Sequence, residues 1–127
     1  MYISIDFESD EAIYQQLCRQ IILEIAGDSL QEGDSLPSVR DMADEIGVNM
    51  HTVNKAYNIL KGEGFLTVDR RHGAVVYIDA EKERALEELK EDLSMAVAKA
   101  RVRKISREEA HAMIDKIWDA YENKESM

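Results

Sequence analysis

The chain has 127 residues, of which 45% are hydrophobic and 33% are charged, and its formal net charge is −10 at pH 7. This length suits one domain, or one small domain with an appendage, and so small a fold often needs a second subunit to bury enough surface. The single cysteine, Cys18, excludes an internal disulfide framework and is typical of a reducing cytoplasm. Neither a signal peptide nor an apolar run of the roughly 20 residues needed to span a membrane is present. We therefore expect a cytoplasmic protein without a membrane partner.

The first predicted element is an amphipathic helix over residues 10–27. Its apolar side chains recur every four residues along one face, at Ile13, Leu17, Ile21 and Ile25. Asp10 is the expected N-cap, because its carboxylate can accept a hydrogen bond from a free N–H group of the first turn. Gly27 is the expected stop.

Two shorter helices follow, separated by a tight turn. Ser38 is expected to cap the second helix and Gly47 to end it, and Asn49 is expected to cap the third. The buried face of the second helix would carry Val39, Met42, Ala43 and Ile46, and that of the third Val53, Ala56, Tyr57 and Leu60. This is the pattern of a helix-turn-helix motif.

The period then changes from that of a helix to that of a strand. Residues 65–78, "FLTVDRRHGAVVYI", are two β-rich runs around a basic turn that contains Gly73, which predicts a hairpin. The expected fold is mostly α with a small β-hairpin: a winged helix-turn-helix domain over residues 1–78, followed by a helical tail.

Residues 79–127 form that tail, and they predict two further amphipathic helices, with Ser106 and Glu109 as a capping box for the last one. Such helices cannot cover their apolar stripes in isolation, so they must pack on each other, on the first domain or on a second copy. We interpret the tail as a dimerisation region. The expected interface residues are Leu86, Leu89, Leu93, Val97, Met113, Ile114, Ile117, Trp118 and Tyr121.

The exposed side of the third helix carries polar residues that suit base and phosphate contacts. A recognition helix enters the major groove with its N-terminal end foremost. Asn54 could then pair with adenine and His51 with guanine, while Asn49 and Thr52 could hold phosphates. Lys55 adds a cation on the same helix.

The acidity of the chain argues against such a role at first sight. Residues 1–78 carry a net charge of −7 and residues 79–127 a net charge of −3, whereas DNA-binding domains are usually basic. The cations nevertheless lie where phosphates are expected: Arg40, Lys55, Arg70 and Arg71. Surface charges farther apart than about 8 Å are largely screened at physiological salt, so a local basic face can function on an acidic body.

Three separated segments resemble the DNA-binding domain of the GntR family of bacterial transcription regulators. They are "IYQQLCRQIILEI", "GDSLPSVRDMADEIGVNMHTVNKAYNILKGEGFL" and "RRHGAVVYI", which together span roughly residues 10–78. The short two-helix tail resembles the YtrA-type branch of that family. The resemblance implies a homodimer joined through the tail helices, and often control of operons for membrane transporters.

The resemblance also implies roles for individual residues. Ser38 and Arg40 belong to the "LPSVR" segment, whose arginine typically reaches the DNA in the family, and His72 and Gly73 match the wing tip that enters the minor groove. Met50 departs from the pattern, because many members have arginine or another polar residue there; it could still touch a thymine methyl group.

We therefore predict a sequence-specific regulator, and a repressor, that binds a palindromic double-stranded DNA operator as a homodimer. Two alternatives stay open. The winged helix could bind protein instead of DNA, or the chain could be a sensor of a small-molecule effector or a metal. Glu108, His111 and Asp115 share one helix face, and Trp118 and Tyr121 could line a shallow pocket between two protomers. No phosphate-binding loop, Cys/His cluster or activated nucleophile is present, so we expect no enzyme activity, cofactor or structural metal.

Overall fold

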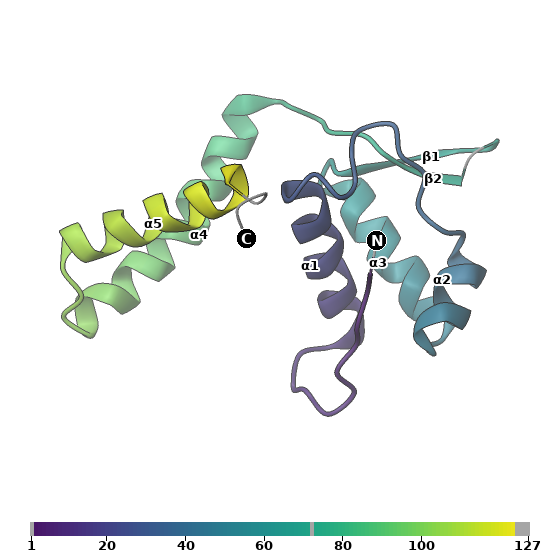
Figure 1. The fold of residues 1–127 in the computed structure, drawn as a ribbon, viewed down its shortest axis with the longest axis horizontal. Coiled ribbons are helices and arrows are strands. Elements are labelled where there is room, and N and C mark those ends of the chain that lie inside the picture. The colour runs from purple at the N-terminus through teal and green to yellow at the C-terminus, as the bar shows by residue number, and fades with distance from the viewer. Residues whose placement is uncertain (1, 72, 124–127) are drawn as a thin grey trace. The chain divides into compact units, whose positions relative to one another are not determined.

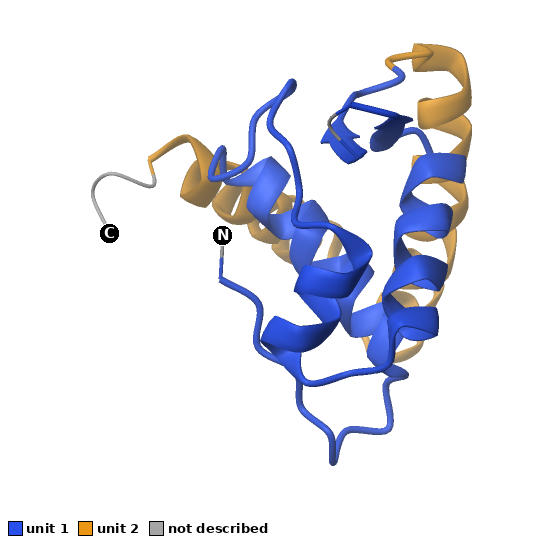
Figure 2. Cartoon of the chain, turned by 90° about the vertical axis from the view of Figure 1, so that its right-hand side faces the viewer, with its two compact units in different colours: residues 1–79 blue, residues 80–127 orange. Residues whose placement is uncertain are grey.

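The computed structural model describes residues 2–71 and 73–123, and the chain divides into two units, Met1–Asp79 and Ala80–Met127. Figure 1 shows the elements in chain order and Figure 2 colours the two units. The first unit contains α1 (Ile13–Ala26), α2 (Val39–Ile46), α3 (Met50–Gly62) and a two-stranded hairpin. The second contains α4 (Lys82–Val102) and α5 (Arg107–Glu122). The predicted fold class, mostly helical with one hairpin, is confirmed.

The start of α1 differs from the prediction. The helix begins at Ile13 with Ala12 at the N-cap position, so the expected capping role of Asp10 is wrong. The reason lies in Gln16, whose side chain is 2% exposed. Its amide accepts from the backbone N–H of Asp6 and donates to the carbonyls of Asp6 and Glu11, each at 2.9 Å. These bonds fix the preceding residues in a turn outside the helix.

The helix-turn-helix boundaries follow the predicted caps. Ser38 Oγ accepts a hydrogen bond from the Asp41 N–H at 3.0 Å, and Asn49 Oδ1 accepts one from the His51 N–H at 2.6 Å. Gly47 ends α2 with φ of 73°, a left-handed conformation that glycine adopts without steric cost. Ser38 thus sets the start of α2, and Gly47 and Asn49 set the turn between α2 and α3, as their residue types predict.

The hairpin consists of β1 (Leu66–Asp69) and β2 (Gly73–Val76), which pair antiparallel with Leu66 opposite Val76. The segment before α2 also lies against β2. The Leu36 N–H donates to the Ala74 carbonyl at 2.8 Å, and the Gly33 N–H donates to the Val76 carbonyl at 2.8 Å. The hairpin is therefore attached on one side to the chain that leads into α2.

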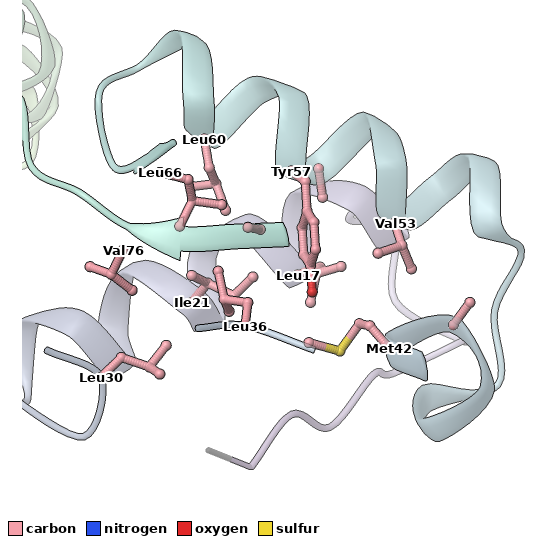
Figure 3. Close-up of a cluster of buried hydrophobic side chains, with 13 residues drawn as sticks. Leu17, Ile21, Leu30, Leu36, Met42, Val53, Tyr57, Leu60, Leu66 and Val76 are labelled. Carbon is pink, nitrogen blue, oxygen red and sulfur yellow. The ribbon is translucent and has the colours of Figure 1, made fainter. Parts of the chain in front are cut away.

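The core of the first unit lies between its three helices and the hairpin (Figure 3). All four side chains predicted for the buried face of α3 are buried. The core also takes one or two residues from every other element of the unit and from the loop before α2. Its members are Leu17, Ile21, Leu30, Leu36, Met42, Ala43, Val53, Ala56, Tyr57, Leu60, Leu66, Ala74 and Val76.

Leu17→Ala is expected to lower the free energy of unfolding of the first unit by about 2–5 kcal/mol, because it removes buried methyl groups and leaves a cavity. Leu17 is 0% exposed. Leu23→Ala, on the same helix but 45% exposed, is the matched control and should cost less than about 1 kcal/mol. Urea unfolding of both variants measures the difference; equal costs would contradict this packing.

The second unit has well-formed helices but no buried side chain on either one. The predicted capping box is confirmed: the Glu109 N–H donates to Ser106 Oγ, and the Ser106 N–H donates to Glu109 Oε1, both at 3.1 Å. The hydrogen bond from the Ser106 backbone lowers the pKa of the Glu109 carboxyl group. Among the described residues, no helix has the length and apolar character that a membrane crossing requires.

Candidate nucleic-acid interface

The third helix, α3, has one face in the core and one face open to solvent. Val53, Ala56 and Leu60 are fully buried, which fixes the rotation of the helix about its axis. The exposed positions at its N-terminal end are Asn49, Met50, His51, Asn54 and Lys55, while Thr52 is half-buried. The structure therefore presents together all six positions that the sequence suggested on and before this helix.

Lys55 has a neighbour that the sequence did not indicate. Its ammonium nitrogen lies 3.9 Å from the centre of the Tyr14 ring of α1, a cation–π contact. Lys55 is thereby held at the α1 side of the recognition helix. A tyrosine 41 positions earlier in the chain gives no local signal of this pairing, although both residues lie beside the predicted buried stripes of their helices.

The beginning of α2 is joined to α3 by a buried tyrosine. The Tyr57 hydroxyl donates to the Pro37 carbonyl at 2.8 Å, and burial raises the pKa of that phenol above its ordinary range. This bond fixes the residues just before Ser38 and Arg40, both of which are exposed. Arg40, the arginine of the "LPSVR" segment that is expected to face DNA, is thus linked to α3 by the hydrogen bond between Tyr57 and the Pro37 backbone.

The wing contributes two further exposed cations, Arg70 and Arg71, at the hairpin turn. The Arg71 N–H donates to Asp69 Oδ1 at 2.7 Å, and Gly73 has φ of 70°, which together shape a tight turn. His72, the remaining predicted wing residue, lies outside the described residues. Figure 1 shows the hairpin turn, α2 and the start of α3 on the same side of the first unit.

The cations of this surface are available for phosphates. Within residues 2–71 and 73–123, the side chains of Arg40, Arg70 and Arg71 form no ion pair, whereas Arg19 on α1 pairs with Glu11 at 2.8 Å. Unpaired, exposed guanidinium groups can make bidentate contacts with phosphate oxygens. A polar helix end between two sets of such cations has the composition of a DNA-binding surface.

Residues 11–76 match the family described as "Bacterial regulatory proteins, gntR family". The chain belongs to the GntR family. It is 32% identical over 118 residues to the HTH-type transcriptional repressor YtrA of Bacillus subtilis, and the match covers 91% of each chain.

Solved structures place this GntR protein in the same branch. YtrA from Sulfolobus acidocaldarius, a GntR-family transcription factor, is 43% identical with a TM-score of 0.60, over 72% of this chain and 97% of that one. A transcriptional antiterminator from Listeria monocytogenes EGD-e is 27% identical with a TM-score of 0.80, over 92% of this chain and 90% of that one. The protein is a YtrA-type DNA-binding transcription regulator, and not an enzyme.

The tail of this GntR protein exposes the whole set of apolar residues predicted for the dimer interface. Their exposed fractions run from 37% for Tyr121 to 65% for Trp118. The two helices therefore do not bury their apolar stripes on each other. The members of the set are Leu86, Leu89, Leu93, Val97, Met113, Ile114, Ile117, Trp118 and Tyr121.

Two kinds of ligand site stay open for the tail from its sequence: a metal site, and a shallow pocket between protomers. Glu108, His111 and Asp115 share a helix face but do not form a metal-binding group, and no such group occurs among the described residues. A pocket lined by Trp118 and Tyr121 between two protomers stays a prediction, and neither residue lines the largest hollow described in the tail of the single chain. That hollow measures 580 Å³ and lies where α4 and α5 meet, between Leu93, Val97 and Ile114 among others. No sequence pattern indicates this hollow, because it depends on the angle between the two helices.

Proposed function

We propose that this GntR protein is a cytoplasmic repressor that binds a palindromic operator as a homodimer. The proposal is carried by one observation: the same chain has both a surface suited to DNA and a surface suited to a second copy. The first unit has a polar helix end flanked by unpaired arginines, and the tail has nine large apolar side chains left exposed. Two-fold symmetry of the protein would then match two-fold symmetry of the DNA.

Each half-site would be read by the N-terminal end of α3 in the major groove. Asn54 would make a bidentate contact with adenine, His51 would donate to guanine N7 or O6, and Met50 would touch a thymine methyl group. The Asn49 side chain already accepts the hydrogen bond from His51, so its amide NH₂ group would serve a phosphate, together with Thr52. With few cations on this helix, we expect a half-site that is not rich in guanine.

The phosphate backbone would be held from both sides of α3. Ser38 and Arg40 at the start of α2 would contact one stretch, and Arg70, Arg71 and Gly73 of the wing would reach the adjacent groove, with His72 at the same turn. Lys55 would add a phosphate contact from its position over Tyr14. Residues 1–78 would thus be the DNA-binding domain.

Residues 79–127 would be the dimerisation region. Exposed apolar side chains on two linked helices can be removed from water only by another surface, and a second copy offers an identical stripe. Repression rather than activation is supported by the likeness to YtrA of Bacillus subtilis, whose name describes a transcriptional repressor. A repressor of this kind needs no contact with polymerase, only occupancy of its operator.

The operator affinity is expected to fall steeply with salt. Four cations per protomer give a dimer slope of log affinity against log salt on the order of −7, which is roughly a 10⁴-fold loss between 50 and 200 mM salt. Fluorescence anisotropy with labelled duplex DNA measures this slope. A slope near zero would remove DNA as the partner and favour a protein-binding winged helix.

Selection of fragmented genomic DNA on the purified protein, followed by sequencing, tests the operator directly. A recurrent inverted repeat would support a two-fold dimer reading DNA sequence, and the neighbouring genes would name the regulated pathway. Enrichment of single, unrepeated half-sites would contradict the palindrome. No enrichment at low salt would contradict sequence-specific binding by the free protein.

A further inference from the structure

The charges of the tail are separated along its length. The segment 93–107, which joins α4 to α5 and is here called the elbow, contains five cations and no carboxylate: Lys99, Arg101, Arg103, Lys104 and Arg107. The start of the tail, residues 80–92, contains six carboxylates against three cations. The last part of α5 carries Asp115, Asp119 and Glu122 against Lys116. Glu108 and Glu109 follow the elbow directly, in the first turn of α5. Apart from these two carboxylates, each two-helix tail is basic at the elbow and acidic toward the opposite ends of its helices.

The elbow cations lie unpaired on the surface in the part of the chain that the structure describes. Across the described residues, none of the five forms an ion pair, and all five are exposed. Figure 1 shows α4 and α5 joined at the elbow and running away from it, so the far ends of both helices lie apart from the elbow. Within one tail, the two charge sets do not neutralise each other.

The 580 Å³ hollow lies at this elbow and is lined by both apolar and positively charged side chains. Leu93, Val97 and Ile114 give it apolar lining, and Arg101, Lys104 and Arg107 give it charge, with no carboxylate among its lining residues. An occupant that fits must be apolar over part of its surface and negatively charged beside it. An apolar group alone would leave the cations unmatched, and an anion alone would leave the leucine and valine side chains in water.

The far half of α5 has the complementary composition. Trp118 is the most exposed of the nine apolar interface residues, at 65%. Asp115 and Glu122 lie three residues before and four residues after it, which places both on the same helix face as the indole ring. A large apolar ring between two carboxylates is the counterpart of an apolar hollow between cations.

We propose that two tails pair antiparallel, with Trp118 of each copy in the elbow hollow of the other and Asp115 and Glu122 against Arg101 and Lys104 of that hollow. This inference rests on the homodimer proposed above and adds its register. A two-fold axis across the helices repeats the contact twice, elbow to acidic end each time. Parallel pairing would instead place five cations against five cations, which costs free energy through like-charge repulsion.

The register can be measured by energy transfer from tryptophan, because Trp118 is the only tryptophan in the chain. One chain keeps Trp118 as the donor. The other carries Trp118→Phe and an acceptor dye on a new cysteine, introduced as Arg103→Cys at the elbow or as Glu83→Cys at the start of α4. Both chains carry Cys18→Ser so that labelling is confined to one site, and circular dichroism checks that each variant folds. The two dye positions lie about 30 Å apart along α4, at 1.5 Å per residue.

The labelled chain is added in excess, so that most donor chains are in mixed dimers. Antiparallel pairing then predicts strong energy transfer to the dye at the elbow and weak transfer to the Glu83→Cys dye. The reverse pattern would overturn the inference in favour of parallel pairing. Weak transfer to both dyes, with a dimer in sedimentation, would also overturn the inference but leave the proposed homodimer intact. A monomer in sedimentation at every concentration would overturn the homodimer itself.

Charge reversal gives a second, independent readout. Arg101→Glu with Lys104→Glu should weaken the dimer roughly tenfold by placing acids against acids. Adding Asp115→Lys and Glu122→Lys to the same chain should restore it, because both sides of each contact are then reversed. Lys99→Glu with Arg103→Glu changes the net charge equally outside the hollow and is the matched control. Failure of the fourfold variant to regain dimer affinity would count against the register.

Discussion

Replacing Leu89 and Ile117 by aspartate is expected to produce a monomer that binds the operator about 100-fold more weakly than the parent, or worse. The two side chains are 51% and 54% exposed in the single chain, so the change should leave each protomer folded. In a dimer, four carboxylates would be buried against apolar groups, which is costly when they have no partners. Losing the dimer removes the gain of roughly 10²–10⁴ in affinity that comes from binding two half-sites at once.

Met95→Asp provides the control for this experiment. Met95 is also on α4 and is 61% exposed, but it lies outside the predicted interface set. It should remain dimeric and bind as the parent does. Sedimentation velocity gives the oligomeric state, and anisotropy with the selected operator gives the affinity. If the Leu89 and Ile117 double variant stays dimeric with unchanged affinity, the tail does not form the dimer.

The helices of the first unit could be predicted from sequence because their boundaries depend on local chemistry. Ser38 and Asn49 accept hydrogen bonds from their own first turns, and Gly47 takes the left-handed conformation that ends α2. These interactions span three or four residues and need no knowledge of the rest of the fold. Asp10 failed as a cap for the opposite reason, since the buried amide of Gln16 fixes the chain around it through longer contacts.

The site was predictable in its residue types and less so in its contacts. The buried stripe of α3 implies which residues face outward, and the structure exposes Asn54 and His51 accordingly. The contact between Lys55 and Tyr14 depends on how α1 crosses α3, which no local pattern encodes. The elbow hollow likewise depends on the angle between α4 and α5. In both cases the missing information is the packing of one helix on another.

Asn54→Ala is expected to weaken operator binding by about 1–3 kcal/mol per half-site, hence about 2–6 kcal/mol for the dimer, with little change in the salt slope. Asn54 is exposed and packs in no core cluster, so its removal should not affect stability. The neutral amide contributes to reading a base and releases no counterion. Discrimination against operators with a changed adenine should therefore fall together with affinity.

Arg71→Ala tests a phosphate contact, and its effect can be compared with that of the base contact removed by Asn54→Ala. Arg71 lies on the wing as an exposed cation, and its loss should weaken binding to all sequences about equally and make the dimer slope shallower by roughly 2, one phosphate per protomer. Anisotropy titrations of both variants, over a salt series and on operators with single substitutions, give the comparison. An Asn54→Ala variant that loses affinity equally on every sequence would place this residue on the phosphate backbone. The bases would then have to be read by His51 and Met50, the other two exposed side chains of α3 that are proposed to contact bases.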